Sequence, residues 1–443
     1  MLVCNAVQIA FAYDYSPKYF RQMALKRLLE NLIRKKVKKE WLPETPLRRC
    51  LTTLDLTSLG FGTIVGAGLY VAIGEVARDT TGPSVVLSIL LASVAALLCA
   101  LSFAEYGSRF PDTGSSYIYT YTTLGEVWAF IVGWNIVLEF LISGASLARK
   151  CSEFINSTSS GKLFLFFEEY LSTHWLVFGN ERTFPDLLAA ALVLAVMAVL
   201  CTGVHNSTNF HNVITAVNLL VITFIIIYGS FFANLQNWTN SFMPHGLHGI
   251  LRGTAIAFLA FTGFDVVAEA AEEAVQPEKS IPRSLFLIII MSTLAYVGVS
   301  TVLTLMMPYK QLKHDAFAPL ADAFQERTFG GAKYIVLSGG ICATISALFC
   351  CIYSTSRVVH SMSVDGLLFR WFSQINHKSQ VPGRATFVSG IIMAILAMIF
   401  QVNQLVSSVF VLLNSTGTDN ANLTCYHLPY YSKLTLHEIN ANR

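Results

Sequence analysis

Two long apolar stretches of the sequence are interrupted by glycine, one near residues 59–70 and one near residues 258–265. Where glycine unwinds a helix, amide N–H groups lose their helical partners. The positive end of the half-helix that follows adds to their attraction for an anion such as a carboxylate. Carbonyl groups freed at the second break can accept hydrogen bonds from an ammonium group. The glycines could instead serve close helix packing, and Gly62 and Gly66 have the spacing for it. The presence of two matching breaks favours a binding site over packing alone.

Four acidic residues lie in or beside apolar stretches, where a charge is costly and therefore predicts a functional role. They are Glu105, Glu139, Asp265 and Glu269. Two of them also have a structural interpretation, because Glu105 could pair with Arg109 on the next helical turn and Glu139 could hydrogen-bond a neighbouring helix. No lysine or arginine lies at the centre of these stretches, so the acids favour a cationic ligand over an anionic one.

The composition predicts the elements that must position these groups. The chain has 443 residues, of which 54% are hydrophobic and 13% are charged, and its mean hydropathy is +0.55. Soluble proteins carry roughly 25% charged residues, so a soluble fold is excluded. Each apolar stretch has about the 20 residues that a spanning helix needs, and the short alternating strands of a β-barrel do not appear. The predicted spans are 52–73, 84–106, 126–148, 184–203, 211–233, 250–270, 284–307, 333–356 and 385–413.

The distribution of charge along the chain predicts its orientation. A run of basic residues before position 50 places the N-terminus in the cytoplasm. In that topology the glycosylation sequons at Asn156 and Asn237 face outside, and we expect the acidic pair Glu272–Glu273 to be solvated at a cytoplasmic helix end. Residues 17–39 have the pattern of an amphipathic helix on the inner membrane surface, although a solvated linker fits equally well.

The two broken segments are the first and the sixth predicted spans. Spans one to five and six to ten would then form the two halves of an inverted repeat, an arrangement typical of a small-molecule transporter with its substrate site at the breaks. We therefore predict an all-α polytopic membrane protein with the broken-helix, inverted-repeat (LeuT-like) transporter fold. Three regions are expected: a basic cytoplasmic arm at 1–50, a transmembrane transporter domain at 51–413 with its tenth span incomplete, and a polar tail at 414–443.

Ten short segments between residues 48 and 406 carry a shared pattern. They are Arg49–Leu51, Gly66–Gly68, Ala104–Gly107, Gly114–Tyr117, Gly133–Asn135, Gly263–Asp265, Glu272–Ala274, Ser280–Pro282, Leu305–Tyr309 and Asp365–Leu367. With this combination the chain resembles the cationic amino acid transporters of the amino acid–polyamine–organocation superfamily. Each segment is short, but the combination is highly specific.

The resemblance implies sodium-independent uptake of arginine, lysine and ornithine across the plasma membrane. It implies that backbone at the first break holds the substrate carboxylate and that backbone at the second holds its amino group. Glu105 matches the essential glutamate of the family, and Glu139 is a possible secondary acid. Asn218 stands where proton-coupled relatives have a lysine; since asparagine carries no proton, facilitated diffusion is expected. The expected substrate-binding residues at the breaks are Thr63, Gly66, Ala67, Gly68, Phe261, Thr262, Gly263, Phe264 and Asp265.

The chain departs from the family pattern at Glu269 and at Ala270-Ala271, so its specificity could differ. The sequence beyond Val406 does not resemble the family. Two alternatives stay open: a carrier of neutral amino acids or polyamines, and a non-transporting binding, sensor or truncated regulatory chain. The sequence has no Walker pattern and no zinc-ligand spacing. We therefore expect no enzyme activity, cofactor, metal or nucleic-acid partner, but a cationic amino acid and the lipid bilayer as partners.

Overall fold

The computed structural model describes residues 34–36, 47, 49–159, 161–162, 164, 185–239, 242–312, 319–327, 330–376 and 379–400. Within these residues the chain is helical, and an isolated bridge between Leu51 and Ala274 is its one β-type pairing. Most of the predicted amphipathic helix at 17–39, the tenth span near 404–413 and the tail at 414–443 lie outside the described residues.

The described helices follow one another with short connections. The α-helices are α3 (Thr53–Ile64), α4 (Ile73–Val76), α5 (Val85–Arg109), α6 (Ser116–Thr123), α7 (Glu126–Thr158), α9 (Leu187–Cys201), α10 (Val204–Ser230), α11 (Gln236–Thr239), α12 (Gly246–Ala260), α13 (Val266–Glu269), α14 (Pro277–Met306), α15 (Pro319–Arg327), α16 (Gly330–Val364) and α17 (Gly383–Ile399). Two π-helical segments, η1 (Gly68–Ala72) and η2 (Ala77–Thr81), flank α4, and 3-10 turns are η3 (Gly82–Ser84), η4 (Ala271–Glu273), η5 (Tyr309–Gln311) and η6 (Arg370–Ser373).

Each of the nine predicted spans coincides with a helix or with two half-helices, although the ends differ. Three shorter apolar helices, α9, α12 and α17, complete the set. The first span is split between α3 and η1, and the sixth is split between α12 and α13. Helix α14 begins at Pro277, earlier than predicted, because proline fits the first helical turn. The helical stretches long and apolar enough to cross a membrane are Gly68–Arg109, Glu126–Thr158, Val204–Ser230, Pro277–Met306 and Gly331–Val364.

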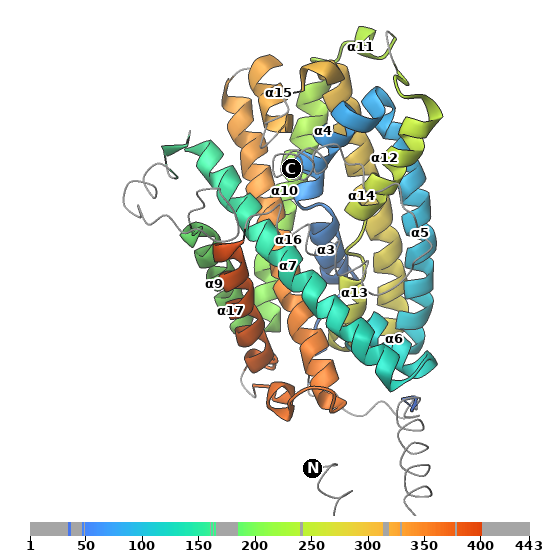
Figure 1. Ribbon diagram of the computed structural model, residues 1–443, viewed down its shortest axis with the longest axis vertical. Coiled ribbons are helices and arrows are strands. Elements are labelled where there is room, and N and C mark those ends of the chain that lie inside the picture. The colour runs from blue at the N-terminus through green and yellow to red at the C-terminus, as the bar shows by residue number, and fades with distance from the viewer. Residues whose placement is uncertain are drawn as a thin grey trace, which may run out of the picture.

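The helices pack in two groups (Figure 1). In the first group α14 packs on α3 and α5, and α12 packs on α5, whereas helices α7, α9, α16 and α17 form the second group. Helix α10 touches members of both groups, since it packs on α16, α14 and α3. The half-helices α3 and α13 lie in the middle of the molecule, between α16 and α14 (Figure 1). Both breaks are therefore enclosed by longer, unbroken helices.

Local sequence explains where the broken helices begin and end. Helix α3 starts at a capping box, in which the Thr52 backbone N–H donates to the Asp55 carboxylate at 2.8 Å. It ends at Ile64, because Val65 leaves the helical region with a ψ of 55°. Helix α12 ends at Ala260, and residues 261–265 form turns before α13 begins.

The predicted sequons and the short helix α6 lie at opposite ends of the molecule. Asn156 lies in the last turns of α7 and Asn237 lies in α11, at the upper end in Figure 1, whereas α6 lies at the lower end. The side-chain nitrogen of Asn237 donates to the Leu305 carbonyl at 2.6 Å, and the Asn156 side-chain oxygen accepts from the Phe164 N–H at 3.1 Å. Glycosylation at both sites and a cytoplasmic N-terminus stay predictions.

Candidate functional site

The two breaks are in direct contact. A Cβ atom built on Gly263 would lie 2.7 Å from the methyl carbon of Thr63 and 3.6 Å from the Ile64 nitrogen. Gly263 also has a φ of 117°, a backbone conformation that is strained for residues with a side chain. Position 263 therefore needs glycine for two independent reasons, and the structure brings Thr63 of the first predicted span against the sixth.

A tyrosine from α14 joins the two breaks. The Tyr296 hydroxyl lies 3.0 Å from the carbonyl oxygen of Ile64, the last residue of α3, and 3.4 Å from that of Ala260, the last residue of α12. Its ring packs on Phe261 with a centroid separation of 5.2 Å. Helices leave their last carbonyls without intrahelical donors, so Tyr296 satisfies groups that the breaks expose. The sequence analysis missed this residue, whose one signal was a hydroxyl-bearing side chain in mid-span.

Asn218 lies at the first break. Its side-chain oxygen accepts a hydrogen bond from the Tyr70 hydroxyl at 2.7 Å, and its side-chain nitrogen donates to the Val65 carbonyl at 3.4 Å. The residue is fully buried. The structure thus brings Asn218, the predicted coupling position, to the unwound backbone.

Two acids lie near each other beside the breaks. Asp265 follows the second break and is partly exposed, and its charge acts on Glu139 of α7. Glu139 is exposed, although it lies within a helix that is long and apolar enough to cross a membrane. In the described part of the chain neither carboxylate has an ion-pair partner. This arrangement is suited to a cationic group.

The other predicted contact residues differ in accessibility. Thr262 is exposed, and its hydroxyl donates to the Leu259 carbonyl at 2.7 Å. Phe264 is buried against Phe103, with ring centroids 5.3 Å apart. The remaining positions are of both kinds: Thr63, Ala67, Gly68 and Gly263 are partly exposed, whereas Gly66 and Phe261 are buried.

Glu105 lies elsewhere. Its side chain is 59% exposed and forms an ion pair of 2.8 Å with Arg109, one turn further along α5. Within the residues that the structure describes, Glu105 makes no hydrogen bond or ion pair with either break. Its role as an essential glutamate stays a prediction from the resemblance, and the geometry supports its structural interpretation.

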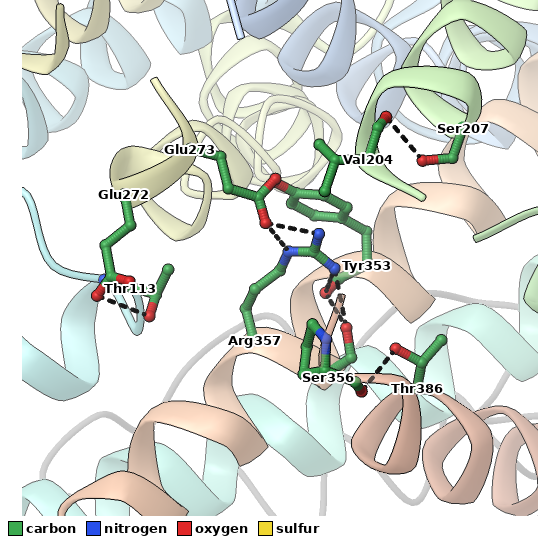
Figure 2. Close-up of polar contacts among 10 residues, drawn as sticks. Thr113, Val204, Ser207, Glu272, Glu273, Tyr353, Ser356, Arg357 and Thr386 are labelled. Atoms are coloured by element: carbon green, nitrogen blue, oxygen red, sulfur yellow. Dashed lines mark hydrogen bonds and ion pairs between the residues drawn. The ribbon is translucent and has the colours of Figure 1, made fainter. Parts of the chain in front are cut away.

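A buried ion pair stands where we expected a solvated acidic pair. The Glu273 carboxylate accepts from Nε and Nη2 of Arg357 at 3.1 and 2.7 Å, and from the Tyr353 hydroxyl at 2.7 Å (Figure 2). Both ion-pair side chains are almost wholly buried, at 1% and 0% exposed. Arg357 also stacks on the Tyr353 ring, with its guanidinium carbon 3.4 Å from the centroid. The expectation for Glu273 was wrong, because the sequence could not show that α16 brings a guanidinium to it.

Glu272 is also held by protein. Its carboxylate accepts from the backbone N–H and the hydroxyl of Thr113, at 3.0 and 3.2 Å (Figure 2). Burial raises the pKa of the Glu272 carboxyl. Thr113 lies in the connection between α5 and α6, so this contact fixes the end of the sixth predicted span to that loop.

A buried histidine completes the polar contacts near α3. His211 on α10 lies 2.8 Å from the Ser346 hydroxyl on α16, through Nε2. Its ring packs on Phe349 with a centroid separation of 4.9 Å. Across the part of the chain that the structure describes, no group of three or more His, Cys, Asp or Glu side chains could hold a metal ion.

An apolar cavity lies behind the first break and does not include the acids. It is lined by residues such as Gly68, Ala72, Ile89, Ala257, Phe261 and Tyr296. Its lining is mostly apolar and holds no acidic side chain that could meet a cationic group. The candidate site is therefore the accessible region of Asp265, Glu139 and the two breaks.

Comparison with known proteins shows the family of the chain. The profile of the amino acid permease family matches residues 51–418. The chain is 43% identical over 385 residues to cationic amino acid transporter 4 of Mus musculus, covering 86% of the chain and 60% of the mouse protein. It is 34% identical over 370 residues to vacuolar cationic amino acid transporter 4 of Arabidopsis thaliana, covering 81% of the chain and 60% of that protein. The chain thus spans 60% of the length of these relatives.

The fold is shared with a solved transporter. A Na⁺-coupled sialic acid symporter in a substrate-bound, outward-open state superposes with a TM-score of 0.56 at 11% identity, covering 83% of the chain and 76% of the symporter. At this identity the likeness shows the fold alone. It confirms the predicted broken-helix, inverted-repeat architecture.

Proposed function

The chain belongs to the amino acid permease family, and we propose that it carries cationic L-amino acids such as arginine, lysine and ornithine across a membrane. The observation that carries the proposal is the pair Asp265 and Glu139, two accessible carboxylates beside the breaks that have no ion-pair partner in the described chain. A cationic side chain would meet favourable charge there. The α-carboxylate would bind the N–H groups at Gly66, Ala67 and Gly68.

Backbone at the second break would hold the substrate α-ammonium. The carbonyls of Phe261 and Gly263 belong to the turns between α12 and α13, outside helical hydrogen bonding. Thr63, Thr262 and Phe264 would form the walls around them. Alternating access would follow from movement of the α3, α5, α12, α14 group against the α7, α9, α16, α17 group.

The contacts of Asn218 support sodium-independent facilitated diffusion. Its amide nitrogen donates to the Val65 carbonyl, so this oxygen at the first break is already engaged by the protein. Asn218 is also unable to carry a coupling proton. The driving force for a monovalent cationic substrate would then be the membrane potential, about 2.3 kcal/mol per 100 mV. We place this transport at the plasma membrane with a cytoplasmic N-terminus.

Labelled L-arginine uptake in sodium-free buffer tests the proposal, with cells expressing the chain and surface protein quantified in parallel. We expect saturable uptake that lysine blocks. Inhibition by leucine or spermidine instead of lysine would favour a neutral amino acid or polyamine carrier. Arginine binding without uptake would favour a sensor or regulatory chain.

A further inference from the structure

Glu269 is a buried acid without a partner. It is the last residue of α13, its side chain is 0% exposed, and neither carboxylate oxygen has a hydrogen-bond partner. Buried polar groups are almost always hydrogen-bonded, since leaving them unsatisfied is costly. The charge of Asp265, one turn earlier, is unfavourable to Glu269. The Arg357 guanidinium, whose charge also acts on Glu269, is bound to Glu273. Folding alone therefore does not explain a carboxyl group at this place.

Two further polar groups in the same region also have no partner. The Tyr119 hydroxyl on α6 and the Ser115 hydroxyl before it are buried and unsatisfied. Tyr119 and the backbone of Gly114 both lie close enough to Glu269 to interact electrostatically with its carboxyl group. The Tyr119 ring packs on Phe103 at 6.1 Å between centroids. An acid, two hydroxyls and an aromatic wall thus converge between α13 and α6.

The next turn of the chain shows what such a set of groups binds. Glu273, four residues after Glu269, is paired with the Arg357 guanidinium beside Tyr353. Glu269 and Tyr119 are the same combination of an acid and a tyrosine. No basic side chain among the described residues forms an ion pair with Glu269. Along the chain Asp265, Glu269 and Glu273 pass from partly exposed to fully buried.

We propose that Glu269 is a second subsite for the cationic side chain of the substrate, one helical turn beyond Asp265 along α13. The assignment rests on the proposed function. The substrate's ammonium or guanidinium group would leave Asp265 for Glu269, with the Tyr119 and Ser115 hydroxyls accepting its remaining N–H donors. Because Glu269 is fully buried, this occupancy requires α13 and α6 to separate. The subsite therefore belongs to a state in which the inner end of the molecule opens.

The test compares two ligands of nearly equal shape and different charge. L-Arginine and L-citrulline differ in a guanidinium against a neutral ureido group. Binding of each to the purified full chain in lipid nanodiscs is measured for the wild type, Glu269→Gln and Glu278→Gln. Glu278 is an exposed acid at the start of α14 and serves as the matched control.

For Glu269→Gln we expect the arginine dissociation constant to rise about tenfold, as for loss of one charge-assisted hydrogen bond. The citrulline constant should stay unchanged, and Glu278→Gln should alter neither. We also expect Glu269→Gln to unfold at no lower temperature than the wild type without ligand, since no hydrogen bond or ion pair of the described chain holds this carboxyl group. A purely structural carboxylate would give a lower unfolding temperature.

An unchanged arginine-to-citrulline ratio in Glu269→Gln, with arginine binding intact in the wild type, overturns the Glu269 assignment alone. If the wild type binds neither ligand, the proposed function fails and the assignment falls with it. Should Glu269→Gln not fold, Glu269→Asp provides the second variant. It keeps the charge and should keep the preference for arginine, so loss of that preference also counts against the subsite.

Discussion

The Thr63 methyl group lies 2.7 Å from the place that a Cβ atom on Gly263 would take, so the two broken helices are in contact at these two residues. We expect Gly263→Ala to lower the stability of the fold by about 1–3 kcal/mol, from positive φ and the clash together. Thermal unfolding of the purified chain measures this, and arginine uptake should fall in parallel.

A second substitution separates the two causes. Thr63→Ser removes the clashing methyl and keeps the hydroxyl, so the double variant Gly263→Ala/Thr63→Ser should recover part of the lost stability. Gly246→Ala is the control, because Gly246 has a φ of 58° but nothing within 4 Å of its built Cβ. If the changes in stability caused by Gly263→Ala and Thr63→Ser simply add in the double variant, the contact between positions 63 and 263 does not contribute to the loss.

Tyr296→Phe removes the hydroxyl that joins the breaks and keeps the ring on Phe261. The carbonyls of Ile64 and Ala260 would then lose a buried donor, at a cost of about 1–3 kcal/mol. We expect a lower unfolding temperature and slower arginine uptake at unchanged surface expression. Wild-type values in both assays would show that water replaces the hydroxyl without loss.

Glu273→Gln leaves the Arg357 guanidinium buried without its counter-ion. Removing one partner of a buried ion pair costs about 3–5 kcal/mol, so this variant should be poorly folded in detergent. The exchange Glu273→Arg/Arg357→Glu should restore part of the stability. The exposed pair Glu105–Arg109 is the matched control, since breaking such a pair costs about 0–1 kcal/mol. Equal effects on stability at the two pairs would contradict the burial argument.

The acids can be ranked by uptake. We expect Asp265→Asn to reduce arginine uptake at least about tenfold, the scale of one lost charge-assisted contact, with surface protein unchanged. The resemblance implies that Glu105→Gln abolishes uptake as well. Uptake that survives Glu105→Gln but not Asp265→Asn would assign the substrate charge to the breaks and leave Glu105 with its ion pair.

Asn218→Lys tests the coupling position. The new ammonium would lie at the Val65 carbonyl that Asn218 now contacts. Because lysine is titratable and asparagine is not, arginine uptake by Asn218→Lys should depend more strongly on external pH than uptake by the wild type. An equal pH dependence of the two proteins would contradict a coupling role for position 218.

The sequence alone predicted the helices and both breaks, because glycine positions and apolar length are local signals. Thr63, Asn218 and Asp265 lie at or beside the breaks, and their roles in binding or coupling stay predictions. The Tyr296 contact and the Glu273–Arg357 pair were not predicted, since each joins helices far apart in the chain. The sequence also did not show which acids are exposed. Glu269 and Glu139 both lie in or beside apolar stretches, yet Glu269 is fully buried and Glu139 is exposed.

Tyr296 has a single hydroxyl proton and two carbonyl oxygens within reach, one from each broken helix. It can satisfy one carbonyl at a time in full. If α12 shifts relative to α3, the Tyr296 hydroxyl can change its acceptor from one carbonyl oxygen to the other. One of the two carbonyls would then keep a hydrogen bond throughout the shift. The ends of α3 and α12 are thus connected by an exchange of hydrogen-bond acceptors at Tyr296. Such an exchange would lower the barrier to their relative movement.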